Sequence, residues 1–189
     1  IQFDYSFDTN RFFDDPVRKA VLEKAGQDLA ARVETTLGEI RPANGNSWTA
    51  TFFHPGTGEQ VRIPNLIVPE GSIIVYAGGR ALRSAEAGEG GSGGYSIAGD
   101  SAWINRVQTR SHHGFSLWGG SISFDTTQPW YVGLDTAGLR SHQIDLYSVA
   151  IHELGHVLGF GTASEFSSSI HGKQFQGATT IHTNGGNSV

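Results

Sequence analysis

The sequence predicts an α+β fold, or an α/β layer, in which helices cover one face of a twisted mixed sheet. Two kinds of segment support this prediction: short strand-like stretches and two longer stretches with the periodicity of amphipathic helices. They follow in the order strand, helix, strands, helix, and then an irregular tail. The length of 189 residues suits one domain that can bury its own core.

The first elements expected are a strand and a long helix. Apolar and polar residues alternate over residues 1–7, which is typical of a half-buried strand. Asp14 or Asp15 can cap the following helix, and Pro16 suits its first turn, where a missing N–H costs nothing. An apolar stripe with a spacing of four then predicts an amphipathic helix that ends near Gly38. The stripe consists of Val21, Ala25, Leu29, Val33 and Leu37, with Leu22 and Ile40 beside it.

Strands are expected in the middle of the chain. Residues 48–53 have strand composition, and residues 72–78 form an apolar run typical of a buried strand. Glycines in residues 83–100 predict a mobile surface loop, either a simple connection or a loop that gates substrate. A short strand follows in which Ile122 and Phe124 share a face.

A second helix is predicted over about residues 146–158. Asp145 can cap its N-terminus, and Gly159 can end it. Apolar residues at several positions can bury the faces that carry no polar motif.

This helix contains the stretch HELGH, which has the spacing of a metal site. Residues four apart on a helix have Cβ atoms about 5–6 Å apart, so His152 and His156 can bind one ion at roughly 2.0–2.1 Å. Glu153 can take a proton from a metal-bound water, whose pKa zinc lowers. A chance occurrence of the motif is the alternative, and the capped amphipathic helix around it argues against chance.

The stretch VAIHELGHVLGFG resembles the active-site helix of the metzincin clan of zinc endopeptidases, whose pattern is H-E-x-x-H-x-x-G-x-x-H. His152, Glu153, His156 and Gly159 match this pattern, whereas Thr162 stands where the clan has its third histidine. The resemblance implies a zincin-like N-terminal subdomain, zinc on the two histidines and Glu153 as general base. It also implies an extracellular enzyme that hydrolyses peptides or proteins.

The stretch GGSISFDTTQPW is similar to the segment that precedes this helix in matrixins. The matching residues are Gly119, Gly120, Phe124, Asp125 and Trp130. The resemblance implies that residues 120–124 form an edge strand that pairs with an extended substrate by β-augmentation. Asp125 corresponds to a calcium-binding residue, but Gln128 replaces a second calcium-binding glutamate and Ser123 replaces a structural-zinc histidine. A turn-capping role is therefore favoured for Asp125, with calcium as the alternative.

Three answers compete for the missing third zinc ligand. It can lie beyond Val189, which is the favoured answer, or it can be His171 or His182 after a long insertion such as leishmanolysin-like members have. The third answer is an inactive site. We expect residues 1–161 to form the N-terminal catalytic subdomain and residues 162–189 to begin an incomplete C-terminal subdomain that lacks the clan's methionine turn. Two imidazoles should hold zinc weakly, so we expect this chain to bind zinc poorly and to cleave nothing efficiently.

Composition excludes several other classes. The absence of cysteine excludes disulfides and thiolate zinc sites. A net charge of −5 without a basic block argues against nucleic acid, and no apolar run approaches a membrane span. The chain does not begin with methionine, so we expect it to be either a processed product or a piece cut from a longer chain; together with the resemblance, this implies secretion. The remaining histidines, His54, His112, His113 and His142, are expected at a strand end or in exposed loops.

A hypothesis of a different class is a non-catalytic extracellular binding module on a peptidase-derived scaffold. Its surface would combine the glycine-rich loop at 84–100 with the aromatic residues Trp103, Phe115 and Trp118. Oligomeric state and cleavage preference are not determined by these patterns.

Overall fold

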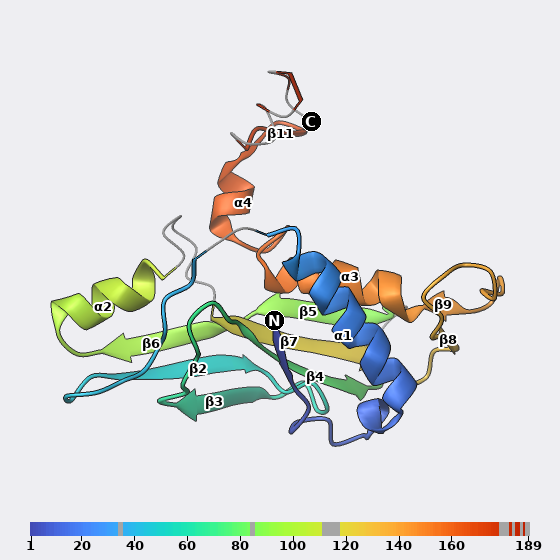
Figure 1. The fold of residues 1–189 in the computed structure, drawn as a ribbon, viewed down its shortest axis with the longest axis horizontal. Helices are drawn as coiled ribbons and strands as arrows, with labels where there is room; N and C mark the ends of the chain where they lie inside the picture. Colours follow the sequence, from blue (N-terminus) through green and yellow to red (C-terminus); the bar gives the residue numbers. More distant parts are fainter. Residues whose placement is uncertain are drawn as a thin grey trace.

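The computed structural model has an α+β architecture, which confirms the predicted class (Figure 1). Two long helices lie on one face of a four-stranded mixed sheet, and a three-stranded sheet lies on its other face. The structure describes residues 1–33, 36–83, 86–110, 118–177, 182, 184–185 and 187.

The four-stranded sheet has the order β1-β4-β7-β5. Strands β1 (Gln2–Asp4), β4 (Ile74–Arg80) and β7 (Gly119–Asp125) are parallel, and β5 (Gly88–Ser92) runs antiparallel to β7. All seven residues of β7 are buried, as expected for a strand that is covered on both faces.

The prediction that residues 120–124 form the edge of the sheet was wrong. β7 is hydrogen-bonded to β4 on one side and to β5 on the other, and β5 is the last strand of the sheet. The polar alternation of β7 resembled a strand with one solvated face, but Ser121 and Ser123 are buried. Their small side chains fit beneath the second sheet, on the same face as Tyr76 of β4.

The prediction of a mobile loop over residues 83–100 was also wrong. This segment forms β5 and β6 (Gly94–Ala98). β6 joins a three-stranded antiparallel sheet of order β3-β2-β6, with β2 (Ser47–Phe53) and β3 (Gln60–Pro64). Glycine weakens a strand in isolation, but backbone ladders need no side chains, and both strands have a neighbour to pair with.

Helix α1 (Pro16–Ala30) begins as predicted, with Asp15 accepting a hydrogen bond from the Val17 N–H and Pro16 in the first turn. It follows a short 3₁₀ helix, η1 (Phe12–Asp14). It ends at Ala30, so the predicted end near Gly38 was wrong. β-branched residues such as Val33 favour the helix less, and Ile40 instead forms a bridge with Val68.

The N-terminal alternation continues past the strand that it predicted. β1 ends at Asp4, and the chain then turns so that its aromatic residues enter two different cores. Phe3 and Tyr5 pack with the first core, beneath α1, whereas Phe7 contacts Phe52 of the second sheet.

The two cores lie on opposite faces of the four-stranded sheet. The first is shared with α1 and α3 (Leu146–Val157). The second lies against β2, β3 and β6 and is closed by α2 (Ser101–Gln108). Trp103 and Trp118 are only 2% and 1% exposed in this second core, which contradicts their proposed place on a binding surface.

The remaining described elements are short. They are β8 (Trp130–Tyr131), β9 (Ile144–Asp145), α4 (Ser164–Ser168), β10 (Ile170–His171) and β11 (Gln174–Phe175). α4 and the β10–β11 pair project away from the body of the molecule (Figure 1). Among the described residues, no helix has the length and apolar character needed to cross a membrane.

Candidate metal centre

Helix α3 positions the HELGH motif, and its predicted ends are confirmed. Asp145 accepts a hydrogen bond from the Ser148 N–H at the N-terminus. After Val157 the helix ends, and Gly159 has a left-handed φ of 94°. Apolar side chains anchor the helix on the sheet, and these are Leu146, Ala150, Leu154 and Val157.

His152 and His156 direct their imidazoles at a common point. Their Nε2 atoms are 3.1 Å apart, and the two rings are nearly perpendicular at 88°. Two nitrogens bound to one tetrahedral zinc at about 2.0–2.1 Å would lie about 3.3 Å apart, so the pair fits two positions of such a site. The spacing of four in the sequence therefore produces the convergence that the motif predicts.

A backbone carbonyl orients the second imidazole. Nδ1 of His156 lies 2.8 Å from the carbonyl oxygen of Phe160, to which a protonated Nδ1 donates. This contact leaves the Nε2 lone pair of His156 free for a metal ion. The turn at Gly159 brings the Phe160 carbonyl back to the helix.

Thr162, at the position of the clan's third histidine, has another role. Its hydroxyl donates a hydrogen bond of 2.8 Å to the carbonyl of His156 and so satisfies one acceptor at the helix end. His171 lies exposed on β10, and His182 is also exposed. Within the described part of the chain, which includes both, no group of three or more metal-ligating side chains is close enough to hold an ion.

Glu153 is buried between α3 and β5. The residue as a whole is only 6% exposed to solvent. Burial raises its pKa, and this effect outweighs the lowering by His152, by His156 and by a hydrogen bond from the Gly90 backbone. A cleft of about 400 Å³ opens here, lined by the two histidines, Glu153, Val149 and residues 86–90.

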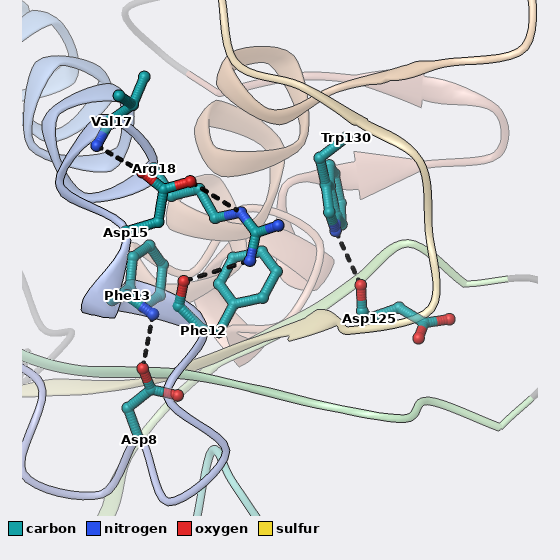
Figure 2. A network of polar contacts seen from close by, with 8 residues as sticks. All are labelled: Asp8, Phe12, Phe13, Asp15, Val17, Arg18, Asp125 and Trp130. Atoms are coloured by element: carbon teal, nitrogen blue, oxygen red, sulfur yellow. Dashed lines mark hydrogen bonds and ion pairs between the residues drawn. The ribbon is translucent and has the colours of Figure 1, made fainter.

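Asp125 lies at the end of β7 and is surrounded by donors. Its carboxylate accepts hydrogen bonds from the N–H and hydroxyl of Thr127 and from the side-chain amide of Gln128. Figure 2 shows that Trp130 donates its indole N–H to the Asp125 carbonyl, at 2.8 Å. A calcium site needs converging oxygen ligands, so these contacts favour the turn-capping role.

Two contributors to this site were not predicted from the sequence. One is the Phe160 carbonyl, which no side-chain pattern reveals. The other is the pair Gly88 and Gly90, whose spacing of two is typical of one face of a strand and was interpreted as a loop. His142 is exposed as predicted, whereas His112, His113 and the aromatic residue Phe115 lie outside the described residues.

Comparisons with known proteins support a peptidase family. The Matrixin family model matches residues 98–180. Metalloendoproteinase 1-MMP of Arabidopsis thaliana is 34% identical over 73 residues, which are 39% of this chain and 20% of that protein. Metalloendoproteinase 4-MMP of the same plant is 44% identical over 52 residues, or 28% of this chain and 15% of that protein. The matched regions thus span a fifth or less of these relatives, and no solved structure matches.

The matched region contains the central strand β7, the turn at Asp125 and the whole of α3 with its two histidines. Sequence likeness and geometry therefore agree on the same part of the molecule. On these grounds residues 98–180 are similar to the matrixins, a family of metzincin-clan metallopeptidases.

Proposed function

We propose that this chain contains the metal-binding helix of a zinc-dependent endopeptidase. One observation carries the proposal: two imidazole nitrogens 3.1 Å apart stand beside a buried carboxylate and face a cleft. The names of the two plant relatives, both metalloendoproteinases, support the reaction class. Action outside the cell is part of the proposal and rests on the resemblance alone; detection of the protein in culture medium tests it.

His152 and His156 would hold the ion through Nε2, with the Phe160 carbonyl fixing the ring of His156. Zinc at this place would lower the pKa of a bound water and polarise the substrate carbonyl. Glu153 would take a proton from the attacking water and pass it to the leaving amine. Its burial beside β5 keeps the carboxylate on the cleft side of the helix.

The substrate would be an extended peptide that pairs with the free edge of β5. The Asp125 N–H donates to the Ala87 carbonyl, and the Gly93 N–H donates to the Gly119 carbonyl. Backbone groups alternate in an antiparallel ladder, so those of Gly88, Gly90 and Ser92 face away from β7. The groups of Gly88 and Ser92 would pair with an added strand, the mode of binding known as β-augmentation, whereas the Gly90 N–H contacts Glu153.

Substitution of the assigned base tests this function in the natural full-length protein. Glu153→Gln should lower hydrolysis of a fluorogenic peptide by about 10²–10⁴-fold, because the proton acceptor is lost. Zinc content, measured by mass spectrometry of the purified protein, should stay unchanged. His156→Ala should lose zinc and activity together, whereas His142→Ala, an exposed loop histidine, serves as the control. Full hydrolysis by Glu153→Gln would show that the base is assigned wrongly.

The ligand count makes a second prediction, for zinc affinity. The 189-residue chain offers two described imidazoles, so calorimetric titration should give zinc binding far weaker than a structural site, whose apparent free energy is about 10–16 kcal/mol. Tight one-to-one binding by this chain would instead reveal a third ligand. His152→Ala should then be compared, because it must weaken binding in either case.

A further inference from the structure

We propose that Gly88 and Gly90 of β5 are positioning residues for Glu153. Their missing side chains let α3 approach the strand so closely that the Glu153 carboxylate lies at the free edge where a peptide would pair. The inference rests on the proposed role of Glu153 as general base. It adds that two glycines of β5 determine the position of the Glu153 carboxylate.

The contact between strand and helix leaves no room for a side chain. A Cβ atom on Gly88 would lie 2.8 Å from both Cγ of Glu153 and Cγ1 of Val149, and 2.9 Å from Oε1 of Glu153. A Cβ atom on Gly90 would lie 2.6 Å from the Glu153 carbonyl oxygen and 3.0 Å from Oε2. Both positions therefore touch the carboxylate itself, and any larger residue must displace it or move the helix.

The requirement for glycine is confined to the face of β5 that meets α3. Successive residues of a strand point to opposite faces, so Glu89 and Gly91 point away from the helix. A Cβ atom on Gly91 would meet nothing within 4 Å, and the Glu89 carboxylate pairs with Arg80. Steric contacts therefore require glycine at positions 88 and 90 but not at position 91.

The carboxylate also meets the strand at its unpaired backbone. The Gly90 N–H faces away from β7, and it hydrogen-bonds with Glu153. Glu153 therefore occupies a point on the hydrogen-bonding line that an added peptide strand would follow. Burial on the α3 face and the N–H at the edge together restrict the carboxylate to the mouth of the cleft.

A pair of matched glycine substitutions in the natural full-length protein tests the proposal. Gly88→Ala should lower kcat by about 10²-fold, the effect of displacing a catalytic group by about 1 Å. KM and zinc content should change little, because His152 and His156 are untouched. Gly91→Ala, the same change on the opposite face of the same strand, should leave kcat unchanged. Equal losses in both variants, or none in a folded Gly88→Ala, would overturn the proposal.

A measurement on the 189-residue chain tests the same geometry without activity. Glu153→Gln should shift the Gly90 amide resonance in a proton–nitrogen NMR spectrum several-fold more than Glu89→Gln does, although residue 89 is the sequence neighbour. A larger effect of Glu89→Gln would refute the positioning of Glu153 on Gly90. If the natural protein hydrolyses no peptide but this shift is found, the proposed function fails while the positioning of the carboxylate stands.

Discussion

At the scale of single residues, two buried carboxylates differ because their neighbours differ. Glu153 is covered by β5 and has a raised pKa, because burial outweighs the effect of the nearby histidines and the Gly90 backbone. Burial also acts to raise the pKa of Asp125, but donors from Thr127, Gln128 and the Leu82 backbone hold it below its ordinary value. The number of hydrogen-bond donors thus accounts for the opposite directions in which the pKa values of these two carboxylates are shifted.

Asp125→Asn tests the structural role at this scale. We expect the free energy of unfolding at pH 7 to fall by about 1–3 kcal/mol, because buried hydrogen-bond donors lose an ionised acceptor. The folded pKa of Asp125 is lowered, so its contribution is fully present above its unfolded pKa of about 3.8 and is lost as the pH falls through the folded pKa. Urea unfolding from pH 7 to pH 3 should therefore show the variant approaching the natural protein at acidic pH. Glu70→Gln, at an exposed acid, is the control; a constant difference at all pH values would contradict the role.

At the scale of elements, α3 combines part of the core and the candidate metal site in one helix. One face carries Leu154 and Val157 into the core, and the other carries the histidines. The turn at the C-terminus of α3 both ends the helix and orients a histidine of the candidate site. Gly159 ends the helix, and the next residue supplies the carbonyl that orients His156.

Gly159→Ala should therefore have two effects. A side chain at a left-handed φ costs roughly 1–2 kcal/mol, so the free energy of unfolding should fall by that amount. Displacement of the Phe160 carbonyl should also weaken zinc binding by about 10–100-fold, as loss of an outer-shell partner does. Chemical unfolding and calorimetry measure the two. Gly38→Ala is the control, since a Cβ atom there would meet nothing within 4 Å; unchanged zinc affinity in Gly159→Ala would separate the turn from the site.

At the scale of the whole molecule, the four-stranded sheet separates two cores that share its strands. Val75 and Ala77 of β4 face the helices. Tyr76, between them, stacks on Phe52 of the second sheet, with the two ring centroids 4.2 Å apart. Strand β7 is buried on both faces in the same way. Neither core can lose its packing without exposing one face of these central strands.

We therefore expect one cooperative unfolding transition. Leu154→Ala in the first core and Val68→Ala in the second should each destabilise the molecule, the former by about 2–5 kcal/mol. For a chain of this length that corresponds to a decrease in Tm of about 4–20 °C. Scanning calorimetry should show a single peak in both variants, with Leu134→Ala, at a residue 63% exposed, unchanged. Two separated peaks would show that the cores unfold independently.

Local patterns were sufficient for the helix that carries the site. The cap at Asp145, the end at Gly159 and the convergence of His152 and His156 all depend on residues within a few positions of one another. The strands at residues 48–53 and 72–78 were found for the same reason, since their β-branched and apolar composition is local.

The errors arose where contacts join distant parts of the chain. α1 ends at Ala30, and Ile40, which the apolar stripe had placed beside the helix, instead pairs with the distant Val68; β5 is a strand because it pairs with β7. A glycine in a loop and a glycine packed beneath a helix look the same in the sequence. Only the residues that surround them in the tertiary structure distinguish the two. The sequence alone determined which helix presents two imidazoles and a carboxylate; the tertiary structure decided which strand lies at the edge beside them, because sheet order is set by pairing between segments that local periodicity does not connect.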